Sequence, residues 1–257
     1  MRRISLIPVT ILLILSFTLS IPQTHAAILS GWGTATIDGV VNPSEWANAA
    51  TIPFSFGGGA YVGTLYIMND AVNIYVGLVI TDTAFDANDG FYTFFDNDNG
   101  GETYNEPGDD AIFQFGSFPF NDLFSNGFVW VNDAPPGTND GQGTGSRVGS
   151  TNHFEMSHPL NTADDSHDFS LSISSIVGIH FAVVVDGTTY QTLGTSYFDP
   201  STWAYDYKVL AKRPPISVTS SVVGGIMFPR NNLVILAPYI ALAVLIGSIF
   251  ILLKKKY

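Results

Sequence analysis

Apolar and polar residues alternate along two stretches in the middle of the chain. Alternate positions are apolar from residue 72 to residue 80 and again from residue 179 to residue 185. A period of two predicts β-strands with one buried face. The second stretch ends at Asp186-Gly187, a pair typical of tight turns between strands. The expected buried residues are Val72, Ile74, Val76, Leu78 and Ile80 in the first strand and Ile179, Phe181, Val183 and Val185 in the second.

The rest of residues 27–213 predicts further short strands joined by connections rich in Gly, Asn and Asp. Only residues 44–50 and 170–176 favour helix, each for one or two turns. Residues 134–150 have almost no apolar side chains, which predicts a long mobile surface loop. The whole pattern predicts an all-β fold, an antiparallel β-sandwich of the immunoglobulin or jelly-roll kind. Further strands are expected at residues 60–69, 91–95, 111–115, 128–132, 152–157 and 205–210.

The chain begins with an apolar segment that follows two arginines. Arg2 and Arg3, the apolar stretch and the small residues Thr24 and Ala26 predict a signal peptide over residues 1–26, cleaved after Ala26. This segment would be a short signal helix. An uncleaved N-terminal anchor is the alternative.

The chain ends with a second apolar segment, at residues 233–253. Its 21 residues, at about 1.5 Å each, would extend roughly 31 Å as a helix, which is enough to cross a hydrocarbon core. Residues 214–232 would be the tether to this transmembrane helix, and residues 254–257, with three lysines, would be a cytoplasmic tail. The expected localisation is the cell membrane, crossed once, with residues 27–213 extracellular.

The charge of the chain is concentrated in its middle. All 22 acidic residues fall within residues 27–213, which hold only four basic residues, Arg147, Lys208, Lys212 and Arg213. A negative field repels phosphate backbones, so we expect no nucleic-acid partner, and it attracts cations. The chain has no cysteine, so disulfides cannot stabilise this domain and bound metal could do so instead.

The densest group of acids lies between residues 82 and 110, where there are nine carboxylates and no basic residue. Calcium prefers six to eight oxygen ligands on a flexible loop. Residues 96–100 (DNDNG) offer alternate oxygens followed by a glycine, without the spacing of an EF-hand. A solvated acidic loop is the alternative. The expected calcium ligands are Asp96, Asp98, Asp109 and Asp110, with Asp82 and Glu102 as weaker candidates.

Residues 35–49 (ATIDGVVNPSEWANA) contain the pattern A-x-I-D-G followed by E-W. This stretch resembles the opening of family 9 carbohydrate-binding modules and their DOMON-like relatives. Residues 65–70 (LYIMND), followed by residues 74–82, are similar to the paired strands after that opening. The resemblance extends over residues 32–210.

Two later stretches keep the order of the family. Residues 94–98 (FFDND), with Asp109-Asp110 following, are similar to its acidic strand end. Residues 153–160 (HFEMSHPL) are similar to its Y-E-x-x-I-P-L strand, with His158 in place of the usual apolar residue. The resemblance implies a β-sandwich that binds sugar, is often supported by calcium and catalyses no reaction. Separately, residues 223–229 and 237–240 look like the C-terminal tail of archaeal cell-surface proteins.

A sugar site needs an aromatic ring for the C–H face of the sugar and polar groups for its hydroxyls. Trp130 lies on an expected strand beside Asn132 and Asp133, and Trp203 lies in an expected loop. These four residues are the candidate carbohydrate-binding site. Both tryptophans could instead belong to the core, as expected for Trp46, because large aromatic residues are usually buried.

Catalytic motifs are missing from the sequence. It has no serine nucleophile elbow and no phosphate-binding loop. His153 and His158 are five residues apart and would face opposite sides of a strand. We therefore expect a protein that is not an enzyme. The DOMON resemblance leaves haem ligation by Met68, Met156, His153 or His158 as an alternative, without a C-x-x-C-H attachment motif.

These features together predict an extracellular, membrane-anchored carbohydrate-binding module that is not catalytic and is stabilised by calcium. Its partner would be a glycan or cell-surface polysaccharide. The alternative is a structural or adhesive cell-surface protein without a sugar ligand. Sugar binding requires Trp130 and Trp203 to be exposed on one concave face, whereas a structural module would bury both.

Overall fold

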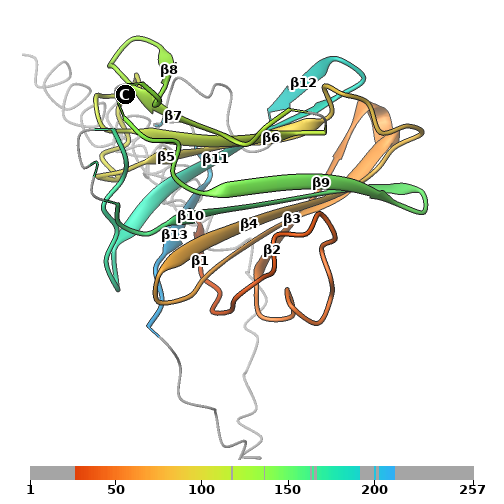
Figure 1. Cartoon of the computed structure of the whole chain (residues 1–257), viewed down its shortest axis with the longest axis horizontal. Helices are drawn as coiled ribbons and strands as arrows, with labels where there is room; N and C mark the ends of the chain where they lie inside the picture. The colour runs from red at the N-terminus through yellow and green to blue at the C-terminus, as the bar shows by residue number, and fades with distance from the viewer. Residues whose placement is uncertain are drawn as a thin grey trace, which may run out of the picture. The chain divides into compact units, whose positions relative to one another are not determined.

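Two β-sheets packed face to face form the described part of the protein in the computed structural model (Figure 1). The structure describes residues 27–116, 118–135, 137–162, 164, 167–191, 200 and 203–211. The expected signal helix, tether, transmembrane helix and cytoplasmic tail lie outside these residues. Within them, no helix has the length and apolar character needed to span a bilayer.

The larger sheet, sheet A, has eight strands, and the smaller, sheet B, has five. Neighbouring strands are antiparallel except for the parallel pair β1 and β13, which confirms the expected two-sheet all-β fold. Sheet A runs in the order β1 (Ala27–Leu29), β13 (Tyr205–Lys208), β11 (Ile176–Val185), β5 (Gly90–Asp96), β6 (Asp110–Phe115), β7 (Asn121–Ser125) and β8 (Trp130–Asn132), with β12 (Thr188–Gln191) also paired to β11. Sheet B runs in the order β2 (Ala50–Phe56), β3 (Tyr61–Asn69), β4 (Asn73–Thr81), β10 (Thr151–Pro159) and β9 (Gln142–Val148), and a short 3-10 turn, η1 (Gly57–Gly59), joins β2 to β3.

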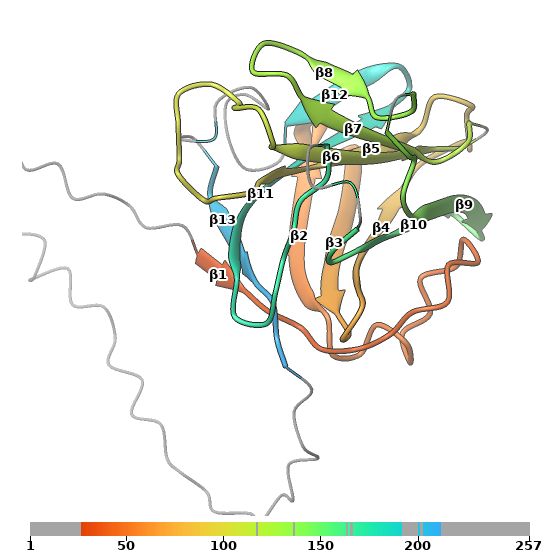
Figure 2. The same ribbon diagram turned by 60° about the vertical axis from the view of Figure 1, so that its left-hand side comes forward.

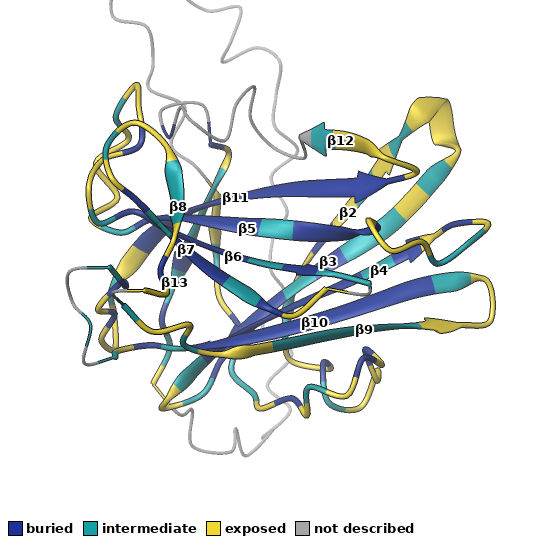
Figure 3. Cartoon of the chain, turned by 45° about the horizontal axis from the view of Figure 1, so that its top comes forward, coloured by how far each residue is buried: buried dark blue, intermediate teal, exposed yellow. Residues whose placement is uncertain are grey.

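The main core lies between the two sheets, and the alternation of apolar residues explains it. The strands β4, β5, β10 and β11 are largely buried (Figure 3). The apolar set of β4 from Ile74 to Ile80 and the set of β11 from Ile179 to Val185 both face this core, as predicted. Val72 is the exception, because it lies in the turn before β4 and is exposed.

The hairpin between β11 and β12 also follows from the sequence. Asp186 and Gly187 connect the two strands and both have positive φ angles, 49° and 69°. Two consecutive positive φ angles are those of a type I′ turn, in which Asp-Gly is favoured because the glycine has no Cβ to clash. The predicted turn is therefore confirmed.

The outer face of sheet B is covered by the segment between β1 and β2, which runs along it in Figure 2. Trp46 is the main residue of this cover, is 2% exposed and packs with Met68 and Tyr75. Its six-membered ring lies directly over Gly77, where a Cβ would come within 3.2 Å of the indole. Trp46 is thus a structural residue, as expected. It covers the outer face of sheet B.

Three expectations about local structure were wrong. Residues 44–49 form turns and bends, residues 170–175 are irregular with one turn, and Ala50 and Ile176 begin β2 and β11, so neither range is helical. Residues 134–150 are not a long loop, because β9 occupies much of them and pairs with β10 along its whole length. Pairing and packing with the rest of the domain therefore outweigh the low apolar content of residues 134–150. The glycines of β9 let the rings of Phe120 and Phe154 pack against its backbone, while its polar side chains reach solvent at the sheet edge.

Candidate functional site: an aromatic pocket and three carboxylate clusters

The outer face of sheet A carries a cluster of aromatic side chains. Along β5, Phe91 and Phe95 point into the main core, so the alternate residues Tyr92 and Phe94 point outward. The rings of Tyr92 and Phe94 stack with centroids 5.6 Å apart, and Trp130 lies 5.2 Å from Phe94. This face therefore has a second, smaller apolar cluster on the side away from sheet B.

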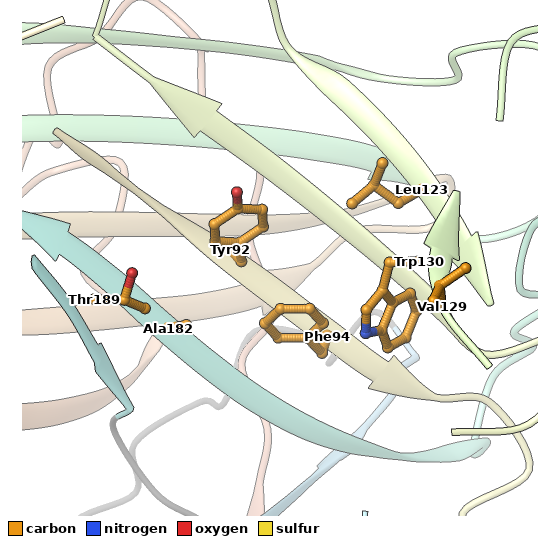
Figure 4. A pocket seen from close by; sticks show the side chains of 7 residues that line it. All are labelled: Tyr92, Phe94, Leu123, Val129, Trp130, Ala182 and Thr189. Atoms are coloured by element: carbon orange, nitrogen blue, oxygen red, sulfur yellow. The ribbon is translucent and has the colours of Figure 1, made fainter. Parts of the chain in front are cut away.

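A pocket of about 370 Å³ opens over these rings (Figure 4). Its size lies at the lower end of the range typical of small-molecule sites. Most of its wall is apolar, while the hydroxyls of Tyr92 and Thr189 supply polar atoms. The indole Nε1 of Trp130 is buried and has no hydrogen-bond partner among the described residues. The lining residues are Tyr92, Phe94, Leu123, Val129, Trp130, Ala182 and Thr189.

Of the four predicted sugar-site residues, only Trp130 lines this pocket, where it forms one wall. Asn132 does not line it but points to the same side of the sheet, because the register pairs it with the pocket residue Leu123. Trp203 belongs to the same cluster but is only 7% exposed, and its ring stacks on His180. The expectation that a sugar site would expose both tryptophans on one face was therefore wrong for Trp203, which does not line the pocket. Asp133 is fully buried, with an oxygen 3.3 Å from Nδ1 of His167, outside the pocket lining.

The predicted calcium ligands divide between two clusters. Asp96 and Asp98 come together with Glu102, with one oxygen from each within 4.8 Å of the others. The loop after β5 turns back so that the backbone N–H groups of Gly100 and Gly101 donate to Asp96. One oxygen of Glu102, Oε2, is buried and lacks a hydrogen-bond partner among the described residues. An all-oxygen set with an unpartnered atom fits the preference of calcium.

Asp109 lies beside this first cluster and accepts hydrogen bonds from the backbone of Asn97 and Glu106. Burial raises the pKa of Asp96 to about 6, and the nearby charge of Glu102 adds to the rise. Burial likewise raises the pKa of Asp109 to about 7, with Asp96 as the main charged neighbour. No basic side chain among the described residues forms an ion pair with Asp96 or Asp109.

Asp110 points to the opposite side of β6 and joins a second, fully buried cluster. Its partners are Asp122 on β7, His158 on β10 and Asp168, which precedes Phe169. Burial raises the pKa of Asp168 to about 7. Burial lowers the pKa of His158, but the hydrogen bond to Asp122 and the charges of the three carboxylates outweigh it and raise the pKa to about 9. The prediction that Asp110 is a ligand in the calcium loop was therefore wrong, and the sequence did not predict this cluster.

A third group contains Asp133, Asp164 and His167, whose Nδ1 lies 3.1 Å from Asp164 Oδ1. His153, by contrast, is on the other face of β10 from His158, as the period of two predicted. There its Nδ1 accepts a hydrogen bond from the backbone N–H of Val41. Met156 points into the main core, while Met68 packs under Trp46.

Comparison with solved structures identifies the architecture. A family 9 carbohydrate-binding module from Caldicellulosiruptor kristjanssonii in complex with glucose superposes with a TM-score of 0.54 at 15% identity, covering 74% of this chain and 100% of that one. The domain has a CBM9-like fold. The same module in complex with cellotriose gives a TM-score of 0.52 at 14% identity, with 74% and 96% covered. No protein-family model and no curated protein sequence matches the chain.

Several residues that line the pocket of the CBM9-like domain were not predicted from the sequence as site residues, among them Tyr92, Phe94 and Thr189. A signal for the first two was present, since both are aromatic at the positions of β5 that alternate with the core residues. An aromatic residue on the expected outer face of a strand indicates either a second packed layer or a ligand site.

Proposed function

We propose that the CBM9-like domain binds carbohydrate in the pocket formed by Tyr92, Phe94 and Trp130, without catalysing a reaction. The supporting observation is the pocket itself, whose wall is formed by the stacked rings of Tyr92 and Phe94 and by Trp130. Thr189 adds a hydroxyl to this wall, which can form a hydrogen bond with a sugar hydroxyl. The aromatic rings would pack against the C–H face of the sugar ring.

The two solved neighbours suggest the class of sugar. Their complexes contain glucose and cellotriose, so a glucose-type pyranose is the first ligand to test. The pocket holds about 370 Å³ and is open on one side, which suits one or two sugar units at the end or edge of a longer glycan. Asn132, on the same side of the sheet, would then contact the next unit.

The experiment is titration calorimetry of the full chain, purified in detergent, with glucose, cellotriose and a panel of other oligosaccharides. Binding that is lost in Trp130→Ala but kept in Phe128→Ala supports the proposal, because Phe128 is 87% exposed and does not line this pocket. Absence of binding to every glycan would overturn it. The structural or adhesive alternative would then be favoured, and the burial of Trp203 is the observation that fits it.

We also propose that calcium stabilises the loop after β5 and that the domain stands on the outer side of a membrane. Asp96, Asp98 and Glu102 would hold the ion, with Asp109 close by. Their oxygens and the orphaned Glu102 Oε2 support this assignment. The apolar segments at residues 1–26 and 233–253 support export and anchoring.

A further inference from the structure

The buried cluster of Asp110, Asp122, His158 and Asp168 has the make-up of a metal site that differs from the calcium loop. All four side chains are fully or almost fully buried, and one ligand atom from each lies within 4.8 Å of all the others. The Nε2 atom of His158 is 3.0 Å from Asp122 Oδ2 and 3.9 Å from Asp168 Oδ1. The cluster lies between the two sheets, because Asp122 pairs with the core residue Ile112.

In each of the three carboxylates, one oxygen accepts a hydrogen bond and the other has no hydrogen-bond partner among the described residues. Oδ2 of Asp110 accepts from the backbone N–H of Phe169, at 3.2 Å. Oδ2 of Asp122 accepts from the backbone N–H of Asp140, also at 3.2 Å, and Oδ2 of Asp168 accepts from the hydroxyl of Thr162. The Oδ1 atoms of the three carboxylates are buried and have no hydrogen-bond partner among the described residues. Three unpartnered buried acceptors in one place favour a bound cation.

The histidine is oriented as a metal ligand would be. Its Nδ1 lies 2.7 Å from the carbonyl oxygen of Pro159, to which it donates, so that Nε2 is the nitrogen that faces the carboxylates. A backbone carbonyl that fixes the far nitrogen of a coordinating histidine is a common feature of metal sites. The ring of Phe169 packs against His158 with centroids 4.6 Å apart and limits its rotation.

Histidine itself is an imperfect countercharge here. Even as an imidazolium it carries a single positive charge beside three carboxyl groups. A divalent ion would place two positive charges at the same point and bind the neutral imidazole.

We propose that Asp110, Asp122, His158 and Asp168 bind a divalent transition-metal ion of the zinc type as a closed structural site. One imidazole and three carboxylate oxygens favour such an ion over calcium, which takes oxygen ligands. Zinc bonds of about 2.0–2.1 Å put tetrahedral ligands roughly 3.3 Å apart, so the side chains need to move by about 1 Å. The ion ties β6, β7 and β10 to the segment before Phe169 and thus joins the two sheets.

His158 is the one nitrogen ligand among the four residues of the cluster. Replacing it by leucine removes that ligand and puts an apolar side chain in its place. The test uses the full chain in detergent, stripped of metal and titrated with zinc alone by calorimetry, with bound metal counted by elemental analysis. We expect one zinc ion per chain. Binding should weaken tenfold or more in both His158→Leu and Asp168→Asn.

Two control variants distinguish zinc bound at this cluster from zinc bound at a neighbouring histidine. His167→Ala alters the adjacent Asp133 and Asp164 group, and His153→Gln alters a histidine on the opposite face of β10; both should leave zinc binding unchanged. X-ray absorption of bound zinc should show a single imidazole among oxygen ligands. Because His158→Leu alone could disturb folding, circular dichroism of both ligand variants is compared with the wild type. The proposal is overturned if the wild type binds no zinc, if Asp168→Asn binds as tightly as the wild type, or if His167→Ala abolishes binding.

Discussion

The indole Nε1 of Trp46 donates a hydrogen bond of 2.8 Å to Oε1 of Glu155, across 109 positions of the sequence. The second oxygen of Glu155 accepts from the backbone N–H groups of Asp38 and Gly39, at 3.1 and 2.9 Å. One buried carboxylate therefore fixes the segment between β1 and β2 over the outer face of sheet B. Two of the stretches that resemble the CBM9 sequence meet at this contact.

Removing that carboxylate should destabilise the domain. Glu155→Ala leaves three N–H donors without their acceptor, and the loss of such partners costs roughly 1–3 kcal/mol for each buried group. We expect a loss of about 3 kcal/mol in the free energy of unfolding, measured by urea titration. Glu155→Gln keeps one acceptor and should lose less. Glu106→Ala, at an exposed acid, is the matched control, and an equal effect of both alanine variants would contradict the role of Glu155.

The same residue should make stability depend on pH. Burial raises the pKa of Glu155 above its ordinary value of 4.5, and the charge of Asp38 adds to the rise, while the hydrogen bond from Trp46 opposes it. Between the unfolded and folded pKa values the folded state holds the proton more tightly. The free energy of unfolding therefore falls as the pH rises through that window.

The difference between the wild type and Glu155→Gln isolates this effect, because His153 on the same strand titrates in both proteins. As the pH rises from 4.5 towards neutrality, the difference should shift in favour of the glutamine variant. Urea titrations at several pH values provide the measurement. A difference that stays constant over this window would show that Glu155 does not titrate abnormally.

In the aromatic pocket, Trp130→Ala should abolish or weaken glycan binding by tenfold or more, which corresponds to about 1.4 kcal/mol. The variant loses the indole ring that forms one wall of the pocket. Thr189→Val, which removes one hydroxyl and keeps the shape of the wall, should have a smaller effect. Titration calorimetry compares the three proteins. Equal affinities would place the sugar site elsewhere on the domain.

In the calcium loop, Asp98→Asn should remove the stabilisation that calcium gives. Added calcium should raise the melting temperature of the metal-free wild type and of Asp168→Asn, but not that of Asp98→Asn, because only the last lacks a ligand in the loop. Differential scanning calorimetry with and without calcium measures this. A calcium response in Asp98→Asn equal to that of the wild type would exclude the loop as the site.

At the sheet edge, Gly145→Ala should destabilise the domain by roughly 1–3 kcal/mol, as expected for overpacking. A Cβ at this position would lie within 2.8 Å of ring atoms of Phe154, a residue of the main core. Val148→Ala on the same strand is the control, since Val148 is exposed. Urea titration compares the two variants. If Gly145→Ala is as stable as Val148→Ala, β9 does not pack against Phe154 as closely as the structure shows.

The sequence by itself determined the strands whose two faces differ and therefore the fold class. The alternation in β4 and β11 and the Asp186-Gly187 turn are local properties, and local properties can be read along the chain. The stretches that resemble CBM9 sequences follow the order of that family along the chain, and they predicted the same architecture. The strand β9 escaped prediction, because its glycines and polar residues form a strand only through pairing with β10 and packing under Phe154.

Only the tertiary structure decided which side chains meet. Asp109 and Asp110 are neighbours in sequence, yet they point to opposite sides of β6, one towards Asp96 and the other towards His158. The period of two of a β-strand predicts that neighbouring side chains point to opposite sides. It does not show that residues of β7 and β10 complete the second cluster. Trp130 meets Phe94 for the same reason. The order and register of strands place residues together across long sequence distances, and hydrophobic patterns specify a face of a strand without naming its neighbour.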